Sequence, residues 1–218
     1  MTLNDPRDPT SFSSHFRARR AVLLRQIMLR AGRRVLDLGG TQEYWQNIGL
    51  PFLQDNGFQV TILNSDQCEL GEGPFQVLVG DACNVGCGDM AFDFVHSNSV
   101  IEHVGTWDRM RMFAHEVRRL APSYYVQSPN WWFPLDPHFY KVPFFHWLPT
   151  GMRASLLQYL PIAHAGRIPT PEAAERVVAG TQLLSSLQMR RLFPDGTLVR
   201  ERFAGLTKSL IMIRQNVC

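Results

Sequence analysis

Apolar residues recur at helical spacing over residues 15–31, at Ala21, Leu24, Ile27, Met28 and Ala31. Most arginines of this stretch fall off that apolar face, and Gly32 follows as a residue that commonly ends a helix. The pattern predicts a helix over residues 15–31. The preceding residues 1–14 are rich in Pro, Asp and Ser, which is typical of a loose tail.

Short apolar runs then alternate with stretches of mixed polarity. The runs cover residues 34–38, 58–64, 75–80, 92–96 and 124–128. The clearest helical stretch between them covers residues 107–120. Short buried strands that alternate with helices predict βαβ units, and therefore a mostly parallel sheet with helices on both faces.

The end of the chain differs, because two strand-like runs lie close together. Residues 198–203 and 206–213 are too near each other for a crossover, so they are predicted to pair as an antiparallel hairpin. Prolines and aromatic residues crowd residues 129–166, where neither a regular strand nor a long helix is indicated. With 218 residues, 45% of them hydrophobic, the chain suits one α/β domain over residues 15–218 with an aromatic-rich cap at about 129–168.

Charge is concentrated at the start of the chain. The formal net charge is +3, yet residues 1–34 carry eight arginines and two aspartates. This imbalance fits an anionic small ligand or a solvated helix face better than a nucleic-acid footprint, so no nucleic-acid partner is expected. No apolar run approaches the ~18 residues that span a bilayer, and the first residues lack the apolar segment of a signal peptide. A cytoplasmic protein without stable membrane insertion is expected.

The cysteines indicate neither a disulfide framework nor a metal site. Cys83 and Cys87 are spaced C-x3-C, and Cys68 and Cys218 complete the set of four. Because no second ligand pair of matching spacing accompanies them, ordinary reduced thiols and no metal requirement are expected.

Candidate chemistry begins where the first predicted strand ends. Asp37 lies inside this strand, and Gly39, Gly40 and Thr41 follow it. Ligands of open α/β sheets bind beyond the carboxyl ends of the strands, where glycines let the backbone approach them, although a plain strand-to-helix turn would use the same residues. The spacing does not match the G-x-G-x-x-G of dinucleotide sites. A buried Asp37 is expected to orient loop amides or a ligand ammonium group.

Later strands bring further polar side chains to the same edge. Asn64 ends the second run, at the position where a ribose-reading side chain belongs. Asp81 follows the third run and can accept a hydrogen bond from an exocyclic amine, while the adjacent Ala82 leaves room for a flat ring. The fourth run delivers Ser97 and Asn98.

Taken in order, these motifs resemble those of the class I S-adenosylmethionine-dependent methyltransferases, most closely the methyltransferase type 11 group. The segments are D-L-G-G from residue 37, G-D-A from residue 80 and F-D-F-V-x-S-x-S-V-I-E-H-V from residue 92. The resemblance covers roughly residues 15–128 and 181–214. It implies a Rossmann-like, mostly parallel seven-stranded sheet with a C-terminal antiparallel strand pair, and S-adenosylmethionine as the cofactor.

The resemblance also implies where the cofactor binds. Its methionine part would lie over Asp37, Gly39, Gly40 and Thr41. The ribose would face Asn64, the adenine would lie at Asp81 and Ala82, and the sulfonium side would be lined by Ser97 and Asn98. The group commonly has a second glycine where Thr41 stands and an acid where Asn64 stands.

Several other residues allow two interpretations. Arg17 and Arg20, one turn apart, either reach the cofactor carboxylate or form a solvated basic face. Glu102 and His103 are either catalytic or structural residues that begin a helix. Three histidines are expected to be ordinary partly buried or surface residues: His96, His115 and His164.

The cap supplies the candidate acceptor side. An aromatic wall with few polar groups suits an apolar or flat acceptor, so the predicted substrate residues are Trp131, Trp132, His138 and His146. His138 is the first candidate for a proton acceptor, with His103 or His146 next, because imidazole titrates near neutrality. The alternatives are a cap that only packs, and an aromatic patch at a membrane surface, which the charged residues and prolines disfavour.

The sequence therefore predicts methyl transfer from S-adenosylmethionine to a small-molecule acceptor, with secondary-metabolite biosynthesis as one setting. Methylation of a glycan or protein, and a non-catalytic S-adenosylmethionine-binding module, remain as alternatives. The sequence indicates no particular oligomeric state.

Overall fold

The computed structural model describes residues 12–66, 71–139, 142–162 and 166–216. Its first helix, α1 (Phe12–Ala31), begins earlier than the predicted start at residue 15. Most of the predicted tail lies outside the described residues, as do three residues discussed above: Cys68, His164 and Cys218. Within the described ranges, no helix is both long enough and apolar enough to cross a membrane.

A seven-stranded sheet forms the centre of the molecule, with the strand order β3-β2-β1-β4-β5-β7-β6. The first five strands pair in parallel, and β7 pairs antiparallel with both β5 and β6. The bounds are β1 (Arg34–Leu38), β2 (Gln59–Asn64), β3 (Phe75–Val79), β4 (Phe94–Asn98), β5 (Ser123–Pro129), β6 (Thr197–Phe203) and β7 (Leu206–Arg214). The predicted parallel sheet with a closing hairpin is confirmed. β5 is buried along its whole length, as expected for a strand covered on both faces.

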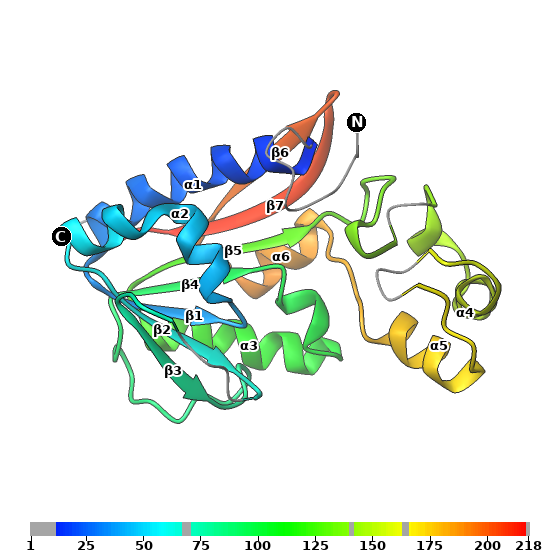
Figure 1. Cartoon of the computed structure of the whole chain (residues 1–218), viewed down its shortest axis with the longest axis horizontal. Helices are drawn as coiled ribbons and strands as arrows, with labels where there is room; N and C mark the ends of the chain where they lie inside the picture. The colour runs from blue at the N-terminus through cyan, green and yellow to red at the C-terminus, as the bar shows by residue number, and fades with distance from the viewer. Residues whose placement is uncertain (1–11, 67–70, 140–141, 163–165, 217–218) are drawn as a thin grey trace.

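Helices cover both faces of this sheet (Figure 1). α1 and α2 (Gln42–Asp55) pack on one face, where Leu24, Met28 and Trp45 belong to one buried cluster. α3 (Trp107–Leu120) and α6 (Ser186–Leu192) pack on the other face in a second cluster. These two apolar layers hold the strand ends, and the loops that follow them, in fixed positions.

A lobe with its own apolar cluster lies beyond the carboxyl end of β5 (Figure 1). It contains η2 (Pro137–Phe139), η3 (Phe145–Trp147), α4 (Thr150–Tyr159) and α5 (Pro171–Ala179). The lobe therefore extends past the predicted cap boundary at residue 168. Within the predicted cap, the ten-residue helix α4 forms where no long helix was predicted, and it buries Ala154 and Leu157 against α5.

Candidate active site

A cleft of about 540 Å³ opens where the parallel strands end. The loops after β1, β2, β3 and β4 line it, with Gly39, Leu63, Asn64, Ser65, Gly80, Asp81, Ala82, Val100, His103, Val104 and Arg109. β1 lies between β2 and β4 in the sheet, so the cleft sits where the strand order reverses, which is the usual ligand position in open α/β sheets. The structure thus brings four predicted cofactor residues together: Gly39, Asn64, Asp81 and Ala82.

The glycine loop after β1 requires both of its glycines. Gly39 has a left-handed backbone (φ 72°), and a Cβ there would lie 2.7 Å from Val100. A Cβ on Gly40 would lie 1.6 Å from Asp37 Oδ2. The loop therefore presents bare backbone to the cleft on one side and packs on the Asp37 carboxylate on the other.

Asp37 is fully buried and uses its carboxylate within the protein. Its Oδ2 accepts a hydrogen bond from Trp45 Nε1 at 2.6 Å, and its Oδ1 lies 2.7 Å from His96 Nδ1. His96 Nε2 lies in turn 3.1 Å from the Tyr44 hydroxyl, and burial is the main cause that raises the pKa of Tyr44 well above its usual value. Asp37 thus supports the loop from beneath, where the sequence analysis expected it to meet loop amides or a ligand ammonium group.

His96 is more deeply buried than the sequence predicted. Only 1% of it is exposed, so it is not a surface or partly buried histidine, whereas 72% of the His115 side chain is exposed. Asp37 and His96 occupy paired positions on the neighbouring strands β1 and β4, a register that only the structure provides. Two polar residues facing each other across two buried strands predict a direct contact.

Thr41 and Asn64 both hold the backbone of the glycine loop. Thr41 is the N-cap of α2, where its hydroxyl accepts from the Tyr44 amide at 3.3 Å. Asn64 Nδ2 donates to the Gly40 carbonyl at 3.0 Å while the residue lines the cleft. The two departures from the family pattern therefore serve the geometry of the loop.

Asp81 forms a two-pronged pair with Arg109, a residue that the sequence analysis did not single out. Arg109 Nη2 lies 2.8 and 2.9 Å from the two carboxylate oxygens, and the Cys83 amide donates to Oδ1 at 2.9 Å. The amide hydrogen bond, followed by Arg109, lowers the pKa of Asp81 despite some burial. The cleft therefore has an ionised carboxylate at its rim, next to Ala82.

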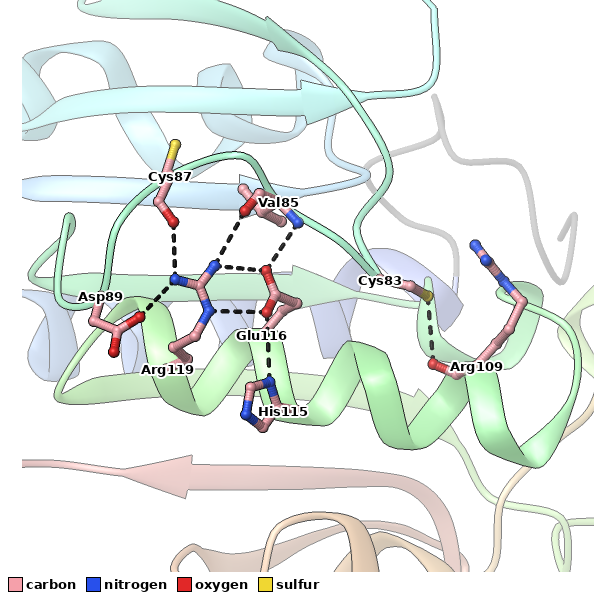
Figure 2. A network of polar contacts seen from close by, with 8 residues as sticks. All are labelled: Cys83, Val85, Cys87, Asp89, Arg109, His115, Glu116 and Arg119. Atoms are coloured by element: carbon pink, nitrogen blue, oxygen red, sulfur yellow. Dashed lines mark hydrogen bonds and ion pairs between the residues drawn. The ribbon is translucent and has the colours of Figure 1, made fainter.

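The loop that follows Asp81 in the chain is fixed by two side chains of α3 (Figure 2). Glu116 accepts from the Val85 amide at 2.8 Å and from Arg119 Nε and Nη2 at 2.9 and 2.8 Å. Arg119 also donates to the Cys87 carbonyl and to Asp89, both at 2.8 Å. Although burial opposes it, Arg119 and the Val85 amide lower the pKa of Glu116. This network ties the backbone at Val85 and Cys87, a few residues after Asp81 and Ala82, to α3.

Ser97, near the end of β4, has a different role from the predicted one beside the sulfonium of the cofactor. Its hydroxyl is fully buried and donates to the Leu38 carbonyl at 3.2 Å, which ties β4 to β1. Asn98 Oδ1 accepts from Arg20 Nη1 of α1 at 3.0 Å. Only 15% of the Arg20 side chain is exposed, and it also lies 3.5 Å from Glu201, so Arg20 is not part of a solvated basic face.

Two imidazoles meet at the other rim of the cleft. His103 follows β4 in η1 (Ile101–His103), and its Nε2 lies 3.0 Å from Nε2 of His138 in the lobe. His103 Nδ1 lies 3.1 Å from the Gly180 carbonyl, and His138 Nδ1 lies 2.7 Å from Asp136 Oδ1. A carbonyl or carboxylate oxygen can only accept, so each Nδ1 carries a hydrogen. In a neutral ring, Nε2 therefore carries a lone pair and no hydrogen. In both rings this nitrogen points toward the other ring.

Glu102 adds a buried carboxyl group beside the two rings. It is fully buried, its Oε2 accepts from Ser128 Oγ at 3.1 Å, and burial raises its pKa to about 7. Burial also lowers the pKa of His103, whereas Asp136 outweighs burial and raises that of His138. Glu102, His103 and His138 offer ligand atoms that all lie within 4.8 Å of one another. No metal requirement was predicted, because the sequence shows no ligand groups of matching spacing; folding places His138 beside the adjacent Glu102 and His103.

The fold can be compared with solved structures, whereas no family model and no curated protein matches the chain. One match is a 1,6-didemethyltoxoflavin N1-methyltransferase of Burkholderia thailandensis with bound 1,6-didemethyltoxoflavin and S-adenosylhomocysteine. The TM-score is 0.54 and the identity 13%, over 94% of this chain and 81% of that one. Another is an S-adenosylmethionine-dependent methyltransferase of Methanosarcina mazei, with a TM-score of 0.51 and 14% identity over 88% and 96% of the two chains.

The chain has the class I methyltransferase fold. A further structure of this fold, from Rhodobacter sphaeroides, is described as Zn-dependent alcohol dehydrogenases, with a TM-score of 0.52 and 13% identity over 90% of this chain and 89% of that one. At such identities the likeness establishes the class I methyltransferase fold, and the reaction must be argued from the site.

In this class I methyltransferase fold, the predicted acceptor residues fall into two groups. His138 contacts His103, which lines the cleft. Trp131 and Trp132 line a second groove with the start of α6, at Leu183, Ser185, Ser186, Leu187 and Gln188. His146 is buried and its Nε2 donates to the Trp131 carbonyl at 2.8 Å, so it positions the tryptophan backbone.

Proposed function

We propose that this chain transfers a methyl group from S-adenosylmethionine to a small-molecule acceptor. The observation that carries the proposal is the cleft in which Gly39, Asn64, Asp81 and Ala82 meet at the strand ends of a class I methyltransferase fold. The Burkholderia thailandensis structure with bound 1,6-didemethyltoxoflavin and S-adenosylhomocysteine supports this proposal by analogy.

The residues of the cleft fit the cofactor. A volume of about 540 Å³ lies within the ~300–1,000 Å³ of small-molecule pockets. Gly39 lines the cleft without a side chain, which suits close approach of a ligand to the backbone. Asn64 offers an amide to ribose hydroxyls, and Asp81 offers an acceptor to an exocyclic amine. The small side chain of Ala82 leaves room for a flat ring at that end of the cleft.

When bound, S-adenosylmethionine supplies an electrophilic methyl group on a sulfonium. The contribution of the chain is to bind and to align, because in-line displacement gains most of its rate from holding the two reactants in line. The glycine loop, supported by Asp37, fixes one end of the cofactor, and Asp81 with Arg109 fixes the other. His103 lies on the wall between the cleft and the lobe, so an acceptor that enters from the lobe meets this imidazole and its partner His138.

We assign the acceptor side to the lobe, with Trp131 and Trp132 as its apolar wall and the imidazole pair as its polar end. Trp132 is 63% exposed, which leaves a large aromatic face for contact with a ligand. His146 holds the backbone of this wall through the Trp131 carbonyl.

The test is incubation of the purified chain with S-adenosylmethionine labelled on its methyl group and a panel of flat hydroxylated or nitrogenous small molecules. Label should appear in a small molecule, and its transfer should be slower at limiting S-adenosylmethionine when Asp81 is replaced by alanine. Transfer of label only to proteins or glycans would show that the acceptor is a polymer and not a small molecule. Binding of the cofactor without transfer to any acceptor would favour a non-catalytic module.

A further inference from the structure

The contact between His103 and His138 poses an electrostatic problem. Both Nδ1 atoms are committed to acceptors, so two neutral rings would bring their Nε2 lone pairs together at 3.0 Å. Two acceptors at hydrogen-bond distance repel each other unless a positive centre lies between them. That centre is either one shared proton or one metal cation.

Glu102 distinguishes the two possibilities. Its Oε1 has no hydrogen-bond partner among the described residues, although the side chain is fully buried next to the two rings. A shared proton satisfies only the imidazoles and leaves this oxygen buried without a partner, which costs free energy. A cation uses all three groups at once.

The surroundings of the three groups are those of metal ligands. Asp136 holds His138, the Gly180 carbonyl holds His103 and the Ser128 hydroxyl holds Glu102. Outer partners of this kind fix the tautomer and the orientation of histidine ligands. With metal–nitrogen bonds of about 2.0–2.1 Å, the separation of 3.0 Å corresponds to an angle of about 95° at the ion. Small side-chain rotations would bring Glu102 into range.

We propose that Glu102, His103 and His138 form a binding site for a divalent first-row transition ion. Two imidazole nitrogens and one carboxylate are a ligand set that zinc and iron(II) accept, with further coordination positions left open. Because His103 lines the cofactor cleft and His138 belongs to the lobe, an ion held by both would lie between the cofactor cleft and the lobe that we assign to the acceptor. Resting on the proposed methyl transfer, this places the acceptor's oxygen on the ion, which would lower the pKa of a hydroxyl group.

The binding test uses the full chain after treatment with a strong chelator, and it does not depend on catalysis. Zn²⁺ is titrated by calorimetry, and Co²⁺ is titrated while its visible absorption bands are recorded. We expect one ion per chain. His103→Ala and Glu102→Gln should each lower the affinity by at least roughly 10-fold, and Asp136→Asn, which changes only an outer partner, by roughly 10–100-fold.

His115→Ala is the matched control, because this histidine is exposed on α3 outside the cluster, and it should bind the ion like the wild type. Circular dichroism of each metal-free variant shows whether it is folded, and Glu102→Gln removes a buried carboxyl group without changing its shape. Titration with S-adenosylmethionine on the same samples reports separately on the cofactor cleft. The absence of Zn²⁺ and Co²⁺ binding in folded wild-type protein, or equal binding in the His103→Ala and wild-type chains, would overturn the site and leave the shared proton.

Discussion

Asp37 of β1 and His96 of β4 occupy paired positions on neighbouring parallel strands, with Asp37 Oδ1 2.7 Å from His96 Nδ1. Trp45 of α2 donates to the other carboxylate oxygen, so one buried group joins two strands and a helix. The same carboxylate occupies the space beneath Gly40. The shape of the glycine loop therefore depends on a group that does not line the cleft.

Asp37→Ala should abolish S-adenosylmethionine binding and lower the free energy of unfolding. It leaves the Trp45 indole and the His96 ring without their buried acceptor, and losing one partner of such a pair costs about 3–5 kcal/mol. Urea unfolding measures the stability, and calorimetry measures binding to the folded fraction. Asp37→Asn keeps the shape and should bind more weakly than the wild type. Asp55→Ala, at an exposed carboxylate that ends α2, should change neither quantity.

Asp81→Ala should weaken S-adenosylmethionine binding by roughly 10–100-fold, the value of one or two hydrogen bonds to a charged group. The stability should change little, because the Asp81–Arg109 pair is nearly half exposed. Calorimetric titration of the variant and of Arg109→Ala separates direct contact from positioning. If Asp81 acts only by holding Arg109, the two variants will lose the same affinity.

The Glu116 network predicts a pH dependence of stability. The pKa of Glu116 is lowered in the folded protein, so its contribution is present above the usual pKa of 4.5 and is lost as the pH falls through the folded value. Glu116→Gln should cost about 2–3 kcal/mol near pH 7 and progressively less in acid. Urea unfolding at several pH values measures this. Asp89→Asn, at a 76% exposed partner of Arg119, should cost less than about 1 kcal/mol, and an equal cost would contradict the assigned role of Glu116.

Trp131→Ala should raise the KM for the acceptor and leave the Kd for S-adenosylmethionine nearly unchanged, because the tryptophan lines the groove beside the lobe and not the cofactor cleft. Steady-state kinetics with a saturating cofactor gives the first value, and calorimetry gives the second. Tyr159→Ala removes an aromatic side chain that is 73% exposed on α4 and should leave both values unaltered. Unchanged acceptor kinetics in a folded Trp131→Ala variant would show that the lobe only packs against the sheet domain and does not bind the acceptor.

The sequence predicted the sheet and much of the cleft for one physical reason. Carboxyl ends of parallel strands meet at one edge, so Gly39, Asn64 and Asp81 converge once the strands are assigned. The imidazole pair could not be predicted this way, because His103 and His138 are 35 positions apart and meet only where the lobe folds back. The role of Arg109 likewise depends on how α3 packs against the loop after β3. The spacing of apolar residues along α3 does not predict that packing.

The central claim is tested most directly by calorimetric titration of the wild-type chain with S-adenosylmethionine and, in parallel, with NAD. One S-adenosylmethionine per chain should bind at the strand-end cleft, S-adenosylhomocysteine should compete with it, and NAD should give no heat of binding. Binding of NAD without binding of S-adenosylmethionine would contradict the proposed methyl transfer.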